Sequence, residues 1–223
     1  MPISRQQGTP GPSNQTVPPK PAPKSAASPS TSPQPAELPR SPWKSIHRAL
    51  VSQRTFFTLA VPVLLVIFAR PKSGWLPWGL ALALLGEMLR FWAAGHLTKS
   101  TQLTTSGPFA HLRHPLYLGS LLIATGYCLM TGLWLSFPIV LALFALFFLS
   151  AMFYEQDFLQ SSFGDEYRRY KAHTPLLLPR ITAYPGPRRR FSWQQFIVNR
   201  EHRVALSVIV FSALFIVRWV LAK

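Results

Sequence analysis

Hydrophobic residues along this chain are collected into long blocks, and shorter polar segments separate the blocks. Blocks of this length fit helices that cross a bilayer, since a spanning helix needs about 20 mostly apolar residues. We therefore predict an all-α, polytopic membrane protein with about five transmembrane helices. The predicted spans run from about Leu50 or Thr55 to Ala69, from Trp75 to about Ala94, from Leu116 to about Met130, from Leu133 to about Tyr154, and from about Val204 to Ala222.

The connections between the blocks decide which helices are neighbours. The link Lys72–Gly74 is so short that the first two spans must form an antiparallel hairpin. The turn at Thr131 and Gly132 does the same for the third and fourth spans. A hairpin places the start of one helix beside the end of the other, so we expect His114 and Glu155 at the same membrane face.

Polar segments lie at the start of the chain and after the fourth span. Residues 1–44 hold 12 of the 22 prolines, and we expect them to form a disordered tail, since they cannot bury enough apolar surface to offset their ordering entropy. The membrane domain then covers residues 45–223. Beyond the fourth span we expect the helix to continue to Leu159, followed by a turn at Gly164, a short amphipathic helix and a proline-rich stretch.

The charge distribution predicts the orientation. The chain is 48% hydrophobic with a formal net charge of +16, and most Lys and Arg lie beside apolar blocks, which favours contact with headgroups over nucleic acid. Segments 1–54, 95–115 and 154–203 hold 7, 2 and 9 of these cations, whereas the opposite side holds only Arg70, Lys72 and Lys223. By the positive-inside rule we expect a cytoplasmic N-terminus and an outside C-terminus.

The second span carries two charged residues, Glu87 and Arg90. Their spacing of three places them on one helix face, within reach of each other. Two interpretations stay open and can both hold: an ion pair within the helix, or a face that lines a pocket. The single cysteine, Cys128, lies inside an apolar block, so a disulfide framework is excluded and we expect a small core side chain.

The polar loop from Gly95 to His114 precedes the third span. Pro115 is well placed as the first helical residue, because its missing N–H would be unpaired there anyway. Exposed amides at this helix entrance favour a ligand's carboxylate. Gly119 allows a ligand or a neighbouring helix to approach closely. From the residues alone, a polar ligand site and a satisfied structural loop are both open.

Several kinds of chemistry find no support in the sequence. The histidines His96, His111 and His114 do not follow a metal-ligand spacing, so we expect no metal site. Neither a serine nor a cysteine sits on a recognisable nucleophile elbow. A transporter is disfavoured because the spans show no internal repeat.

Two ordered motifs resemble a known family. Ser106–Gly119 is similar to the Gly-Pro-Tyr…Arg-His-Pro-x-Tyr-x-Gly motif of the isoprenylcysteine carboxyl methyltransferases, which are related to membrane phospholipid methyltransferases. Residues 155–179 resemble the second signature, Glu-Glu-x-x-Leu…Phe-Gly-x-x-Tyr-x-x-Tyr ending in Pro. Upstream, Glu87–Lys99 is similar to bacterial members. The resemblance covers about residues 80–180.

The resemblance implies an integral enzyme of a bacterial-type inner or plasma membrane. Such an enzyme transfers a methyl group from S-adenosylmethionine to a lipid or a lipidated small molecule. The cofactor pocket would face the cytoplasm, between the loop before the third helix and the segment after the fourth. Glu155 and His114 would position the reactants, and no further catalytic residue is assigned. Carried across by motif, the cofactor-binding residues are His96, Thr101, Gln102, Leu103, Thr104, Phe109, His114, Pro115, Leu116, Tyr117 and Glu155.

Three positions depart from the family pattern. Phe109 replaces the first Tyr of the loop motif, Gln156 replaces the second acid, and Ala151 stands where eukaryotic members carry a substrate-facing Arg. The acceptor is therefore open between a prenylcysteine-like carboxylate, another lipid acid and a phospholipid amine. The alternative hypothesis is a non-catalytic membrane or scaffold protein that retains the fold. The sequence leaves the oligomeric state open.

Overall fold

A computed structural model of the chain describes residues 59–72, 74–98 and 102–222, and every regular element in these ranges is helical. The predicted all-α class is thus confirmed for the described part of the chain. The tail, the start of the first span and Thr101 lie outside it. In chain order the helices are Leu59–Phe68, α2 (Leu76–Ala94), η1 (Gly107–Ala110), α3 (Pro115–Thr131), α4 (Ser136–Phe144), η2 (Ala145–Leu149), α5 (Ser150–His173), α6 (Trp193–Val198) and α7 (Glu201–Leu221).

Two of the described helices are long and apolar enough to cross a membrane. One is the helix Ser136–His173, which joins α4, the π-helical turn η2 and α5, and the other is α7. The helices Leu59–Phe68 and α3 are apolar but shorter. These lengths support a membrane protein, whereas the count of five spans stays a prediction.

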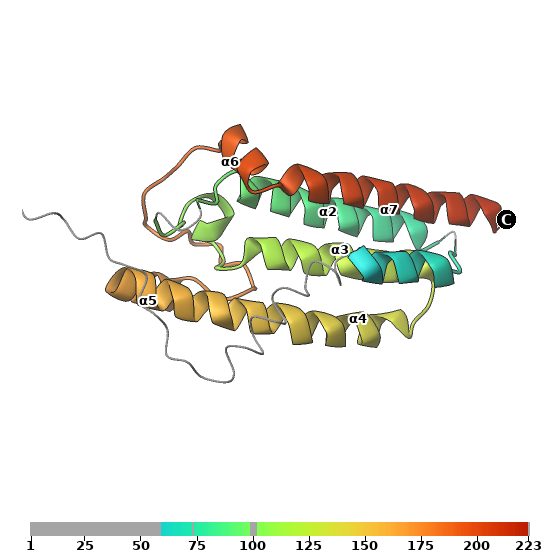
Figure 1. Cartoon of the computed structure of the whole chain (residues 1–223), viewed down its shortest axis with the longest axis horizontal. Helices are drawn as coiled ribbons and strands as arrows, with labels where there is room; N and C mark the ends of the chain where they lie inside the picture. Colours follow the sequence, from blue (N-terminus) through green and yellow to red (C-terminus); the bar gives the residue numbers. More distant parts are fainter. Residues whose placement is uncertain (1–58, 73, 99–101, 223) are drawn as a thin grey trace, which may run out of the picture. The chain divides into compact units, whose positions relative to one another are not determined.

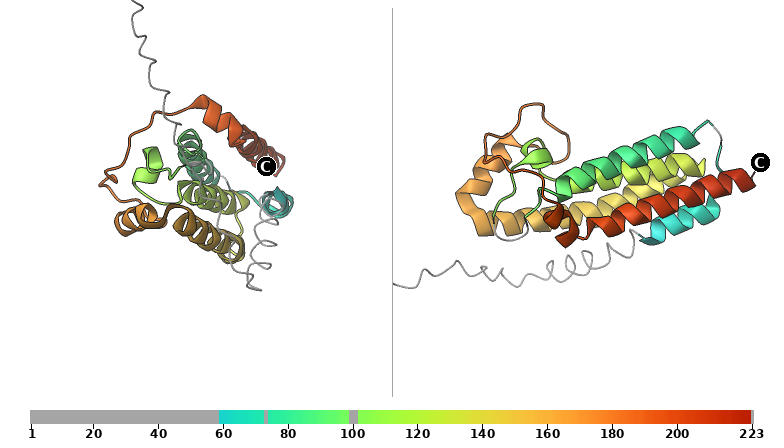
Figure 2. Two further views of the ribbon diagram at one scale, coloured as in Figure 1. Left: turned by 60° about the vertical axis from the view of Figure 1, so that its left-hand side comes forward. Right: turned by 90° about the horizontal axis from the view of Figure 1, so that it is seen from above.

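The ends of α3 lie where local chemistry predicts them. Pro115 is its first residue and His114 its N-cap. After Thr131 the chain turns at Gly132, whose φ of 69° is left-handed and therefore suits glycine. This turn returns the chain as α4, so α3 and the helix Ser136–His173 form the predicted antiparallel hairpin, which Figures 1 and 2 show.

Glycines bring α2 and α3 into backbone contact. A Cβ added at Gly79 would lie 2.6 Å from the carbonyl oxygen of Gly126, and one added at Gly86 would lie 2.6 Å from that of Gly119. Larger side chains would therefore separate the two helices, which run side by side in Figure 1. Gly119 makes room for a helix, which decides between the two roles that the sequence left open.

The α2–α3 pair packs against α7 through a buried apolar cluster. Tyr127 of α3 lies against Phe215 of α7, with ring centroids 5.5 Å apart. Cys128 is buried, as predicted for a core side chain. The cluster consists of Ala69, Leu76, Ala83, Ile123, Tyr127, Met130, Val208 and Phe215.

The region after the fourth span follows the prediction in part. Gly164 breaks α5 with φ 49° and ψ −117°, and helix continues on both sides of it. The six-residue helix α6 was not predicted. Ser192 caps α6 by accepting a hydrogen bond from the Gln195 amide, and Phe196 buries the helix against Phe91 of α2.

Candidate functional site

The α3–α4 hairpin brings the first motif to Glu155. The hydroxyl of Tyr117, in the first turn of α3, donates to the Glu155 carboxylate over 3.2 Å. The Nδ1 atom of His114 lies 3.7 Å from the same carboxylate oxygen. These contacts confirm that His114 and Glu155 share one end of the hairpin, as the sequence predicted.

His114 is neutral near pH 7. Its residue is only 4% exposed, and burial, reinforced by the nearby Arg113 cation, lowers its pKa to about 4. The contact with Glu155 is therefore not an ion pair at neutral pH. The Nε2 atom is buried and finds no hydrogen-bond partner among the described residues. Such an atom is costly to bury unpaired, so it is well suited to meet a ligand.

The segment that follows α5 holds the His-Pro loop in place. The amide of Arg113 donates to the Pro175 carbonyl over 2.9 Å, and the His114 amide donates to the Leu176 carbonyl over 3.2 Å. The second motif thus supports the backbone of the first. Sequence reasoning paired the two motifs only through Glu155 and missed this backbone contact.

The two tyrosines of the second motif pack against the loop of the first motif. Tyr170 donates its hydroxyl to the Phe109 carbonyl over 2.7 Å, and Tyr167 is buried beside it. Burial is the main cause that raises the pKa of both phenols. Leu103 packs into the same cluster. Phe109 therefore contributes its main chain to the loop support, a contact that does not need the hydroxyl of the usual Tyr.

The other predicted cofactor residues are held by neighbours in and around the loop. His96 is buried and its Nδ1 lies 2.9 Å from the Trp92 carbonyl oxygen. Thr104 accepts a hydrogen bond from the Thr98 amide over 3.2 Å. Gln102 accepts from Arg189. These contacts fix the loop's shape, whereas His114 and Tyr117 lie against Glu155 itself.

The entrance of α3 offers fewer free amides than the sequence suggested. Pro115 has no N–H, and the amides of Tyr117 and Leu118 both donate to the His114 carbonyl over 3.1 Å. The carbonyl of Leu116 accepts a hydrogen bond from the Arg90 guanidinium. An anion at this helix end would consequently depend more on side chains than on the main chain.

The ion pair within α2, one of the two interpretations that the sequence left open, is not present among the described residues. Arg90 instead pairs with Glu201 of α7 at 2.5 Å, and it donates to Ser120 of α3. Both carboxylate oxygens of Glu87 are buried without a hydrogen-bond partner among the described residues. The spacing of three was misleading because a better-placed acid lies on another helix. The sequence did offer one signal for this contact, because Glu201 is a lone acid at the start of the last span.

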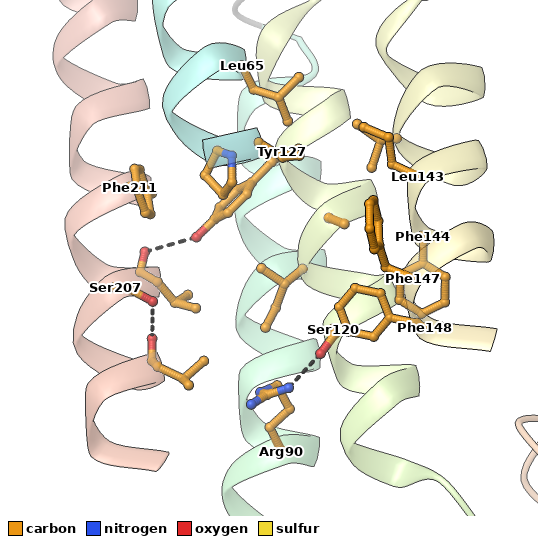
Figure 3. Close-up of a pocket in the computed structure, with 17 residues that line it drawn as sticks. Leu65, Arg90, Ser120, Tyr127, Leu143, Phe144, Phe147, Phe148, Ser207 and Phe211 are labelled. Carbon is orange, nitrogen blue, oxygen red and sulfur yellow. Dashed lines mark hydrogen bonds between the residues drawn. The ribbon is translucent and has the colours of Figure 1, made fainter. Parts of the chain in front are cut away.

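Arg90 also lines an apolar cavity, as the second interpretation of this helix face predicted. The cavity has a volume of about 100 Å³ and lies between the helix Leu59–Phe68, α2, α3, α4 with η2, and α7. Figure 3 shows Arg90 and Ser120 at one end of it, with phenylalanine rings along the wall. The aromatic side chains that line it are Tyr127, Phe144, Phe147, Phe148 and Phe211.

One ring links the cavity to the polar site. Phe148 lines the cavity and packs edge-on against Tyr117, with centroids 5.7 Å apart. Tyr117 in turn hydrogen-bonds Glu155. The apolar cavity and the polar cluster therefore share a wall between α3 and the helix Ser136–His173.

Two of the positions that depart from the family motifs are buried on α5. Gln156 accepts a hydrogen bond from the Arg113 guanidinium over 2.6 Å, so a neutral amide faces this cation. Ala151 is buried and offers no polar group. In the described residues, no three His, Cys, Asp or Glu side chains are grouped to hold a metal.

Comparison with known proteins finds one matching family and several relatives. The phospholipid methyltransferase family matches residues 77–166. The cobalt-zinc-cadmium resistance protein CzcN of Cupriavidus metallidurans is 34% identical over 163 residues, 70% of this chain and 73% of the relative. Protein-S-isoprenylcysteine O-methyltransferase B of Arabidopsis thaliana is 31% identical over 160 residues, 60% of this chain and 78% of the relative. The protein-S-isoprenylcysteine O-methyltransferase of Schizosaccharomyces pombe is 30% identical over 101 residues, 45% and 43% of the two chains. No solved structure matches significantly.

The matched region contains both halves of the site. Residues 77–166 include the His-Pro motif of α3 and Glu155 of α5, which the hairpin brings together. The apolar helices agree with a membrane protein. The chain belongs to the family of membrane methyltransferases that includes the phospholipid and isoprenylcysteine methyltransferases.

Proposed function

We propose that this protein transfers a methyl group from S-adenosylmethionine to a lipophilic acceptor at the cytoplasmic face of the membrane. One observation carries the proposal: Glu155, His114 and Tyr117 meet beside the end of an apolar cavity. The polar cluster suits a charged cofactor, and the cavity suits an apolar acceptor. The methyltransferase names of two relatives give independent support.

The side chains present fit this cofactor. The Glu155 side chain is 44% exposed, and its carboxylate can accept from ribose hydroxyls or pair with an ammonium group. The unpartnered Nε2 of His114 can make one further hydrogen bond. We infer that the remaining loop residues, Thr101 to Thr104 and Phe109, complete the site around these two.

When bound, S-adenosylmethionine supplies a methyl group already activated on a sulfonium. The protein then has to hold, orient and shield its reactants, since well-placed reactants gain on the order of 7–11 kcal/mol from proximity. Glu155 and His114 hold the polar ligand, and the packed rings of Tyr117 and Phe148 exclude water on the cavity side. A carboxylate acceptor needs no general base for this transfer.

The apolar character of the acceptor follows from the cavity. Its wall is apolar and aromatic, with Arg90 and Ser120 as polar groups at one end. We infer that the apolar chain of a lipid or a lipidated small molecule occupies it. Prenylcysteine-like carboxylates, other lipid acids and phospholipid amines are all candidates.

Cofactor binding by the purified protein tests the proposal. We expect S-adenosylhomocysteine to bind in detergent, measured by calorimetry, and Glu155→Ala and His114→Ala to weaken binding by roughly 10- to 100-fold, the usual cost of losing a charge-assisted hydrogen bond. Glu166→Ala and His202→Ala remove the same side-chain types at exposed positions of α5 and α7 and should bind normally. Unchanged affinity in both site variants would show that the ligand binds elsewhere.

A further inference from the structure

The stretch between the second motif and α7 is strongly basic. From residue 167 to residue 200 the chain has eight Lys or Arg and no Asp or Glu. Of the flanking acids, Asp165 pairs with Arg168, and Glu201 is buried and paired with Arg90. The positive charge of this stretch is therefore not neutralised by acids within it.

Part of this stretch, residues 184–192, forms a strap across the candidate cofactor loop. At one end the Tyr184 amide donates to the Ala110 carbonyl over 2.8 Å, and at the other the Ser192 amide donates to the Gly95 carbonyl over 2.9 Å. The strap is thus fixed at both ends and keeps its arginines in a defined place.

Three consecutive arginines lie on this strap. Arg188, Arg189 and Arg190 are all exposed. Arg189 donates to Gln102 of the cofactor loop. Arg188 and Arg190 form no ion pair with a described residue.

Exposed apolar side chains follow the arginines directly. On α6, Trp193 is 64% exposed, Ile197 60% and Val198 61%. The other side of the helix is held by Phe196, which is buried against Phe91. A short helix with a Trp and aliphatic residues outward, beside a group of arginines, has the composition of a segment that lies at a bilayer surface.

We propose that the strap and α6 bind anionic phospholipid headgroups, with Arg188 and Arg190 on the phosphates and Trp193 among the headgroup carbons. The location agrees, because α6 leads within three residues into α7, a helix long enough to span the membrane. A soluble polyanion would match the charge but would leave the Trp193, Ile197 and Val198 side chains in water.

Lipid binding here would support the cofactor loop. A headgroup on Arg188 and Arg190 adds a further anchor between the two ends of the strap, and the strap contacts the loop through Arg189 and Gln102. This consequence rests on the proposed function, whereas lipid binding itself does not. The two can fail separately.

Native mass spectrometry of the full chain in detergent tests the surface, with phosphatidylglycerol and phosphatidylcholine as probes. We expect the wild type to retain phosphatidylglycerol preferentially, and Arg188→Gln/Arg190→Gln to weaken this retention on the order of 30-fold, since each of the two cations contributes about 1 kcal/mol near an anionic surface. Arg169→Gln/Lys171→Gln removes two cations that are likewise exposed and form no ion pair with a described residue, here on α5, and should retain the lipid. Both variants keep Arg189 and the strap anchors, and circular dichroism checks their fold.

Several outcomes would overturn the proposal. Equal losses of phosphatidylglycerol in the two double variants would show that net charge alone accounts for the binding. Equal retention of the two lipids would remove the headgroup preference. Displacement of the lipid by excess inorganic phosphate would indicate a site for free anions, and stronger binding of an RNA oligonucleotide that needs Arg188 and Arg190 would indicate a nucleic-acid surface.

Discussion

The Tyr117 hydroxyl donates to the Glu155 carboxylate over 3.2 Å and thereby joins the first turn of α3 to α5. The same tyrosine ring packs against Phe148 at the cavity wall. The hydroxyl of Tyr117 therefore belongs to the polar site, and its ring belongs to the wall of the apolar cavity. A mutation can remove the first contribution and keep the second.

Tyr117→Phe should remove the hydrogen bond and keep the ring contact. Because the lost donor served a carboxylate, we expect S-adenosylhomocysteine affinity to fall by roughly tenfold. Thermal stability should change little, since the Phe148 contact remains. Tyr154→Phe, on the same helix as Glu155, is the matched control. A fall in affinity that is equal in both variants would show that Tyr117 has no special role.

The lowered pKa of His114 predicts how stability depends on pH. The imidazole has a pKa of about 4 when folded and about 6.5 when unfolded. The unfolded state therefore binds more protons between these values. The His114 contribution to the free energy of unfolding is therefore fully present above about pH 6.5. It is lost as the pH falls towards 4, and the free energy of unfolding then decreases by at most about 3 kcal/mol. Thermal unfolding in detergent from pH 7 to pH 4 should show a smaller slope for His114→Gln than for the wild type, and equal slopes would contradict the assignment.

The Arg113 cation should control the His114 pKa together with burial. Arg113 faces the neutral Gln156 at 2.6 Å, so the residue at this contact does not neutralise the charge that acts on the imidazole. Arg113→Gln and Gln156→Glu should both raise the His114 pKa, the first by removing the charge and the second by neutralising it. Imidazole NMR shifts measure this pKa. Arg168→Gln, at an exposed position, should leave it unchanged.

The pair between Arg90 and Glu201 should hold α7 against α2. Both side chains are largely buried, 13% and 5% exposed, so removing one partner leaves an uncompensated charge. We expect Arg90→Ala or Glu201→Ala to destabilise the protein by about 3–5 kcal/mol, and the double variant by much less than the sum. The exposed pair Arg168–Asp165 should cost under about 1 kcal/mol. Additive losses in the Arg90–Glu201 cycle would show that the two residues do not interact.

Local signals predicted the parts of this protein that depend on neighbours in sequence. Pro115 and Gly132 mark the ends of α3 because their backbone preferences act within one turn. The meeting of His114 and Glu155 followed from a turn too short for any arrangement but a hairpin. These features need no knowledge of the distant packing.

Features set by distant packing were beyond the sequence. The spacing of Glu87 and Arg90 left an ion pair within the helix open as one of two interpretations, but α7 packs on α2 and presents Glu201 to Arg90. The support of the His-Pro loop by Pro175 and Leu176 uses main-chain atoms, which leave no pattern in side chains. The helix α6 has six residues, too few to show a hydrophobic period.

Transfer of a labelled methyl group to lipid tests the central claim most directly. Membranes that contain the protein are incubated with S-adenosylmethionine labelled on the methyl group, and the extracted lipids are separated and identified. We predict a labelled lipid species with the wild type and with Glu166→Ala, and its loss with Glu155→Ala. An absence of labelled lipid with correctly folded wild-type protein would contradict this account and favour a non-catalytic membrane protein that retains the fold.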